Sequence, residues 1–130
     1  LAGASGGCQA EVGSGSGMAA SAICHVKGGS TDQIGHACAM ALKNLMGLVC
    51  DPVGGLVEVP CVKRNVGGAF NAIAAADMAL AGIESQIPVD QVIDAMKEVG
   101  DKMDVSLRET GFGGVAGSMK AAEIVERMNM

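Results

Sequence analysis

The spacing of apolar residues is the feature that most constrains how this chain can fold. In the clearest stretch the apolar positions are Ile34, Ala37, Cys38, Ala41, Leu42, Leu45 and Met46. A recurrence every three or four positions is typical of an amphipathic α-helix, whereas a half-buried strand alternates with a period of two. No segment alternates in that way, so the sequence predicts an all-α fold.

The same pattern predicts a compact bundle of about five helices. The expected helices cover approximately residues 11–27, 31–48, 61–82, 88–103 and 118–128. Ser30 and Gln33 form a capping-box sequence before the second helix, and Ser118 is placed to cap the last. A glycine- and proline-rich loop, residues 50–61, separates the second and third helices. The fourth helix is expected to turn these residues toward the core: Val89, Val92, Ile93, Met96 and Met103.

Length and composition limit the function classes. The 130 residues suit one domain, here a single all-α domain over residues 1–130, and the opening on Leu1 suggests part of a longer protein. The net charge is −5, basic residues form no stripe, and aromatics make up only 2%, which argues against nucleic-acid binding. No apolar run is long enough for a membrane span. We therefore expect a cytoplasmic protein.

The five cysteines fall into two groups. Their odd number and the absence of a C-x-x-C pair disfavour a disulfide framework and a zinc finger. Cys24 and Cys38 lie on apolar helical faces, where a cysteine usually behaves as a small core residue. Cys8, Cys50 and Cys61 lie in turn-rich sequence at helix boundaries, from which thiolates can converge on a soft metal or an iron–sulfur cluster. Scattered loop cysteines without any metal remain the alternative.

Three longer motifs resemble a known family. "GGCQAEVG" at residues 6–13, "GLVCDPVGGLVEVPC" at 47–61 and "KRN" at 63–65 are similar to the later part of the α chain, or α domain, of iron–sulfur-dependent L-serine dehydratases. The similarity continues through "NAIAAADMALAG" to "RETGFGG" and covers roughly residues 3–114.

The resemblance implies a cofactor, a reaction and candidate residues. Cys8, Cys50 and Cys61 match the family positions taken to hold a [4Fe–4S] cluster, whose open iron serves as a Lewis acid. Family members convert L-serine to pyruvate and ammonia without pyridoxal phosphate, a step of amino-acid degradation that supplies gluconeogenesis. The further candidates are Glu11 and Asp51 for acid–base work, and Arg64 and Asn65 for binding the substrate carboxylate.

The resemblance also implies missing parts. Members of this family carry an upstream portion of the α domain and a β domain or subunit, so we expect this chain alone to be inactive and the complete protein to be a homo-oligomer. Two alternatives stay open. One is a related iron–sulfur lyase acting on threonine or cysteine, and the other is a helical interaction module that is metal-free or binds zinc.

Overall fold

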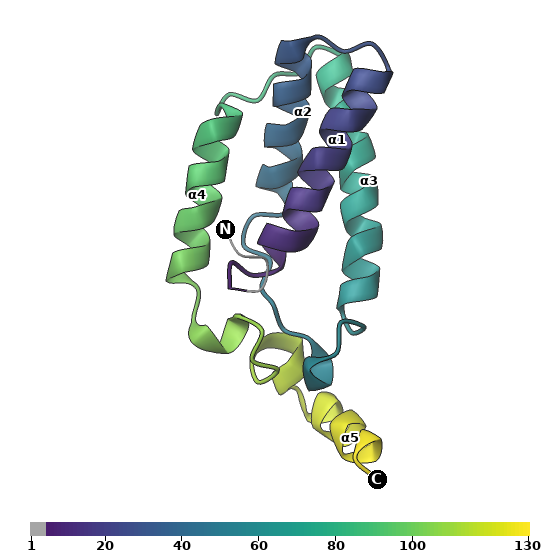
Figure 1. The fold of residues 1–130 in the computed structure, drawn as a ribbon, viewed down its shortest axis with the longest axis vertical. Helices are drawn as coiled ribbons and strands as arrows, with labels where there is room; N and C mark the ends of the chain where they lie inside the picture. The colour runs from purple at the N-terminus through teal and green to yellow at the C-terminus, as the bar shows by residue number, and fades with distance from the viewer. Residues whose placement is uncertain (1–4) are drawn as a thin grey trace.

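Helices and loops make up the whole of the described chain, residues 5–130 of the computed structural model (Figure 1). The elements are η1 Gln9–Gly13, α1 Ser14–Val26, α2 Thr31–Asn44, η2 Val53–Gly55, α3 Cys61–Leu80, α4 Val89–Lys102, η3 Val105–Leu107, η4 Gly114–Gly117 and α5 Met119–Met128. Within this range the only β-type pairing is one isolated bridge, between Cys50 and Arg108. The predicted all-α fold is confirmed. None of the described helices has the length and hydropathy to cross a membrane.

The helices α1, α2 and α3 form a three-helix bundle around a core of small side chains (Figure 1). The buried residues of this core are Ala20, Cys24, Ala37, Met40, Ala41, Ala72, Ala75, Ala76 and Ala79. Small residues let helix backbones approach closely. At Gly68 of α3, an added Cβ would lie 2.7 Å from Val12 Cγ1, so any larger side chain would separate α3 from η1.

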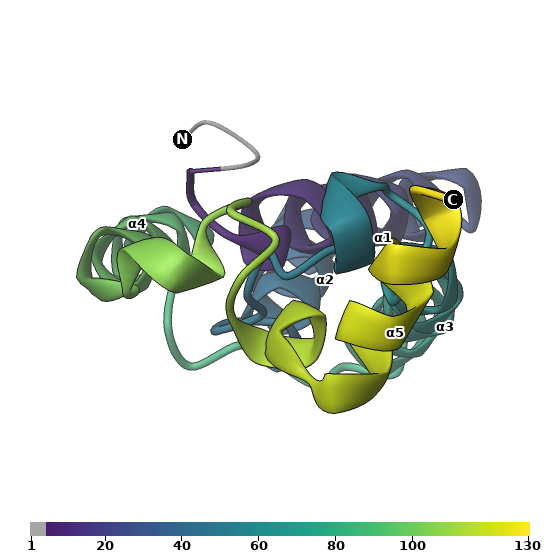
Figure 2. The same ribbon diagram turned by 90° about the horizontal axis from the view of Figure 1, so that it is seen from below.

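The remaining helices attach at the periphery. Val92 and Met96 of α4 are buried against α2 in a second core cluster. Ile93 was predicted to face this core but is 41% exposed, because the contact of α4 with a single helix buries only a narrow stripe. At the lower end of the molecule, α5 packs on η2 and η4 (Figures 1 and 2).

The helix caps explain where the elements begin and end. Ser30 Oγ accepts from the Gln33 backbone N–H, and Gln33 Oε1 accepts from the Ser30 N–H, which confirms the predicted capping box. Ser118 caps α5 by accepting from the Ala121 N–H. However, α2 ends at Asn44 and not near Leu48, since Gly47 adopts a left-handed backbone with φ +95°.

The segment after Cys8 is a π-helix, not the start of the α-helix that the sequence predicted. Its first residue, Gln9, is fully buried and donates from Nε2 to Gly6 O at 3.0 Å and to Met96 O at 2.9 Å. Gln9 Oε1 accepts from the Gly47 N–H at 3.0 Å. These bonds fix the orientation of Gln9. The π-helix therefore buries the Gln9 side chain, and α1, which follows it, buries its own small residues. Such turns are frequent at functional sites.

Candidate functional site

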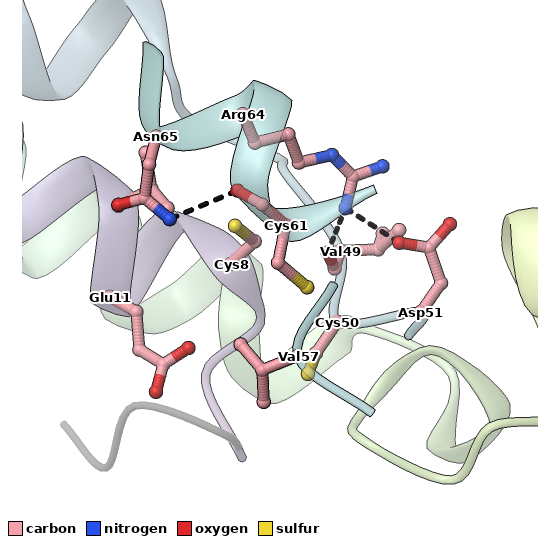
Figure 3. Close-up of a pocket in the computed structure, with 10 residues that line it drawn as sticks. Cys8, Glu11, Val49, Cys50, Asp51, Val57, Cys61, Arg64 and Asn65 are labelled. Atoms are coloured by element: carbon pink, nitrogen blue, oxygen red, sulfur yellow. Dashed lines mark hydrogen bonds and ion pairs between the residues drawn. The ribbon is translucent and has the colours of Figure 1, made fainter. Parts of the chain in front are cut away.

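A pocket of about 360 Å³ lies where the start of η1, the loop after α2 and the first turn of α3 meet (Figure 3). Its volume falls within the roughly 300–1,000 Å³ typical of small-molecule sites. The lining residues are Cys8, Glu11, Val12, Val49, Cys50, Asp51, Val57, Cys61, Arg64 and Asn65. All seven residues singled out from the sequence therefore line the same pocket, although they come from three separate segments.

The shared pocket, not solvent exposure, distinguishes the two groups of cysteines. Cys8 precedes η1 and is only 6% exposed, whereas Cys50 and Cys61 are half-buried. Cys24 is fully buried in the bundle core, as predicted, and Cys38 is half-buried beside the second core cluster. Judged by exposure alone, Cys8 would be grouped with the core residue Cys24, and Cys38 would be grouped with Cys50 and Cys61. What Cys8, Cys50 and Cys61 have in common is that they line one cavity.

The backbone around two of the cysteines is tightly fixed. Gly7, just before Cys8, has φ +80°, and a Cβ there would lie 2.6 Å from Leu48 O, so this position requires glycine. The Cys50 N–H donates to Leu107 O at 2.8 Å, and Cys50 O accepts from the Glu109 N–H at 3.0 Å. The Cys50 loop is therefore held by a segment that follows α4 in the chain.

Arg64 connects the surroundings of all three cysteines. Its Nη1 donates to Val49 O at 2.9 Å and to Asp51 Oδ1 at 2.6 Å, and these two residues flank Cys50 (Figure 3). Its guanidinium also interacts with the Cys8 thiol. Arg64 itself lies one turn after Cys61 on α3. This single side chain therefore ties the Cys50 loop to the helix that carries Cys61.

Asp51 is a buried carboxylate whose two oxygens both have partners. It is 2% exposed, and while Oδ1 accepts from Arg64, Oδ2 accepts from the Val115 N–H at 2.7 Å. Burial lowers the pKa of Arg64, but the hydrogen bond and the charge of Asp51 outweigh it, so that the pKa of Arg64 is raised overall. Asp51 thereby joins the pocket to the segment around η4.

Burial disfavours the thiolate form of two of the pocket cysteines, Cys8 and Cys50, by raising their pKa. Burial raises the pKa of Cys8, and the positive charge of Arg64 only partly opposes this effect. Burial also raises the pKa of Cys50 to about 11, and the nearby carboxylates of Glu109 and Glu11 add to the increase. Metal ligands bind as thiolates, so a metal or cluster entering this site must displace the thiol protons.

Two polar side chains line the pocket opposite the Asp51–Arg64 pair. Glu11 is exposed, and within residues 5–130 no hydrogen bond or ion pair engages its carboxylate. Asn65 Nδ2 donates to Cys61 O at 2.9 Å (Figure 3). Within the described residues Glu11 thus differs from Asp51 in having no hydrogen-bond partner for its carboxylate, while Asn65 is anchored beside Cys61.

The chemistry of the donor set is compatible with an iron–sulfur cluster. Among the described residues, no three Cys, His, Asp or Glu side chains are grouped around a position for one metal ion. A tetrahedral zinc site needs its sulfur ligands to meet at one centre, about 2.3 Å from each. In an iron–sulfur cluster each thiolate binds a different iron, so the ligands surround a volume. Three thiols around a 360 Å³ cavity match that second arrangement.

Sequence reasoning missed the contribution of the C-terminal part of the chain. Glu109 lies close enough to Cys50 to affect its pKa, and the Val115 N–H completes the hydrogen bonding of Asp51. Glu109 is also the one non-glycine residue in the described range with positive φ, at +68°. The available signals were the family-like stretch "RETGFGG", which contains Glu109, and the glycine-rich stretch "TGFGGVAGS", which by itself predicts only a loop.

Comparison with known proteins adds independent information. The sequence model of the family described as "Serine dehydratase alpha chain" matches residues 1–116. The chain is 60% identical over 128 residues to a probable L-serine dehydratase, alpha chain, of Bacillus subtilis, covering 98% of this chain and 43% of that protein. It is 54% identical over 124 residues to the L-serine dehydratase, alpha chain, of Peptoniphilus asaccharolyticus, covering 95% and 42%.

A third relative is a longer protein. The L-serine dehydratase of Streptomyces coelicolor is 47% identical over 117 residues, which cover 89% of this chain and 26% of that protein. The chain therefore spans less than half the length of all three of these relatives.

Proposed function

This chain belongs to the serine dehydratase alpha chain family, and from that premise we propose that it is the cluster-binding part of an L-serine dehydratase α chain. The observation that carries the proposal is the meeting of Cys8, Cys50 and Cys61 at one cavity. The complete enzyme would convert L-serine to pyruvate and ammonia. The reaction requires removal of the α-proton and departure of the β-hydroxyl group as water, after which the aminoacrylate tautomerises and hydrolyses.

The three thiolates would hold a [4Fe–4S] cluster. Soft sulfur ligands favour iron–sulfur clusters, and three ligands leave one of the four irons without a protein ligand. When bound, the cluster supplies Lewis-acid assistance to departure of the hydroxyl group, which is otherwise a poor leaving group. The cation of Arg64 beside Cys8 would offset part of the negative charge that the thiolates introduce.

The remaining pocket residues take different roles in this proposal. The sequence suggested Asp51 for acid–base work, but its oxygens are engaged by Arg64 and Val115, so we assign it to positioning the Cys50 loop. Glu11, whose carboxylate is accessible from the pocket, is the proposed proton-transfer group. The proposed donors to the substrate carboxylate are Asn65 and the N–H groups of Arg64 that are not bonded to Asp51 or Val49.

Full activity would need parts beyond this chain. The names of the relatives specify an alpha chain, which implies a further chain, and most of their length lies outside the match. We therefore propose that the active enzyme contains a β chain or domain together with the rest of the α chain. A related substrate, such as threonine, would be separated from serine by assaying the rebuilt enzyme on both.

Anaerobic reconstitution with iron and sulfide tests the cluster assignment. The wild-type chain should bind about four irons and develop a broad visible absorption. Cys8→Ala, Cys50→Ala and Cys61→Ala should each lose most of this iron, because each removes one of three ligands. Cys24→Ala and Cys38→Ala are the matched controls, since both thiols lie outside the pocket, and they should retain it.

Two results would count against the proposal. If the three pocket variants bind as much iron as the controls, the cysteines of the pocket are not the ligands. If zinc binds with the same dependence on the three cysteines and iron does not, the site is a structural zinc site and the helical-module alternative is favoured.

A further inference from the structure

The outer face formed by α1 and α3 has the composition of a buried surface. The whole of α1 contains no Asp, Glu, Lys or Arg. Val26 of α1, on the same side of the helix as Gly15, is 83% exposed, and Phe70 of α3 is 69% exposed. A helix on the surface of a finished domain normally carries polar and charged residues on its solvent side. This face therefore lacks the covering that its composition requires.

An apolar stripe runs along α3 beside α1. Val62, Val66, Phe70 and Ile73 follow each other at spacings of three or four residues, so they lie on one side of the helix, and all four are exposed. The stripe ends at Asp77, which forms an exposed ion pair with Lys27 at 3.1 Å. An exposed stripe of this length is typical of an interface, not of scattered surface residues.

A groove between the two helices lies next to the stripe. It has a volume of about 270 Å³, and its helical walls include Gly15 and Ala19 of α1 and Gly68 and Ala69 of α3. The groove and the candidate site share Glu11, Val12 and Asn65 as lining residues, so the two hollows adjoin. Whatever fills the groove therefore also borders the proposed cluster site.

Gly15, which lines the groove, is a helical glycine that no contact among the described residues requires. A glycine inside a helix costs about 1 kcal/mol relative to alanine. Gly17 and Gly68 are explained within this chain, because a Cβ at either would press on Leu42 or Val12. At Gly15 a Cβ would meet nothing within 4 Å among the described residues. Glycine at this position leaves room for another backbone to approach α1 from outside.

We propose that the α1–α3 face is the surface on which the rest of the α chain packs, with one of its helices in the groove. This inference rests on the proposed function and deepens it, since the packed segment would form a wall of the cluster pocket. More than half of the Bacillus subtilis α chain lies outside the matched region. A permanently covered, mainly apolar face resembles a domain core cut in two, whereas surfaces between separable partners are more polar.

The test compares two contexts of the same sequence. One is the 130-residue chain, and the other is a chimera in which this chain replaces its matched region in the Bacillus subtilis α chain. Amide hydrogen exchange in α1 and α3 should be at least about tenfold slower in the chimera. Exchange in α5, which packs on η2 and η4, should not change. Unchanged exchange in α1 and α3 would overturn the inference.

A pair of glycine substitutions provides the second measurement. Gly15→Met should keep or raise the urea midpoint of the 130-residue chain, because it improves helix propensity in open space. In the chimera the same substitution should lower the midpoint, since the methionine occupies the groove. Gly35→Met is the matched control: Gly35 lies in α2, a Cβ there would also meet nothing within 4 Å, and the substitution should behave alike in both contexts.

Other outcomes would assign the face differently. If Gly15→Met raises the midpoint in both contexts, the groove is not filled by the α chain. If the 130-residue chain is a dimer that Gly15→Met separates, a second copy occupies the face and the inference is wrong. None of these measurements involves iron, so they can succeed or fail independently of the reconstitution experiment that tests the proposed function.

Discussion

Arg64 and Asp51 illustrate how one buried ion pair can organise a site made of loops. The Arg64 side chain bonds to both neighbours of Cys50 and acts on Cys8, and Arg64 itself lies one turn after Cys61. Its partner Asp51 extends the connection to Val115. The loop that carries Cys50 lies outside the long helices, so these hydrogen bonds fix it in place of regular secondary structure.

Asp51→Asn should therefore weaken both folding and cluster binding. The amide removes the negative charge opposite Arg64 and can satisfy only some of the present bonds, so we expect a loss of about 1–3 kcal/mol in unfolding free energy. Iron retention should also fall, although the amide has nearly the same size and shape as the carboxylate. Urea denaturation and iron content measure the two effects. Wild-type iron retention in this variant would argue that the pair does not position Cys50.

Gln9 is a second residue whose importance follows from burial. Gln9→Ala would leave Gly6 O, Met96 O and the Gly47 N–H without their present partner, so we expect a loss of about 2–4 kcal/mol in unfolding free energy. Gln91→Ala on the exposed side of α4 is the control and should be nearly neutral. Equal midpoints for the two variants in urea denaturation would contradict the anchoring role of Gln9.

The individual elements were predictable where local rules decide them. The capping box at Ser30 and the cap at Ser118 follow from short-range hydrogen bonding, and both are present. The errors occurred where distant contacts decide. The α2 terminus is set by the backbone of Gly47, which bonds to Gln9, and the π-turn depends on a side chain reaching Met96. A pattern of apolar residues carries no information about such contacts.

The η4 turn offers a test at the scale of one element. Gly114 has φ +59°, and a Cβ there would overlap the Asp51 carboxylate. Gly114→Ala should displace η4 from Asp51, with a loss of more than about 2 kcal/mol in unfolding free energy and reduced iron retention.

The variant Gly55→Ala distinguishes the cost of backbone strain from the cost of the overlap between residue 114 and Asp51. Gly55 has a comparable φ of +73° but open space around its Cα, so its substitution should cost only about 1 kcal/mol. Thermal unfolding of both variants gives the comparison. If Gly55→Ala were as damaging as Gly114→Ala, strain alone would account for the effect and the contact with Asp51 would be unimportant.

At the scale of the whole molecule, the sequence predicted which residues meet but not how they are held. Cys8, Cys50 and Cys61 were identified from the sequence together with Glu11, Asp51, Arg64 and Asn65, and all seven line one pocket. Their positions came from motifs shared with a family, not from helical periodicity. The hydrogen bonds from the 107–115 segment to Cys50 and Asp51 could not be read from the sequence, because they join residues more than fifty positions apart through loops.

The attachment of Cys50 and Asp51 to residues 107–115 has a consequence for biosynthesis. Translation is vectorial, so the last of the three cysteines, Cys61, leaves the ribosome well before Val115 does. Until then the Cys50 loop lacks the backbone partners that fix it, and the ion pair of Asp51 lacks its second support. A nascent chain thus exposes the three pocket thiols before the backbone partners of Cys50 and Asp51 have been synthesised, so we expect the pocket to form only after residue 115 has left the ribosome.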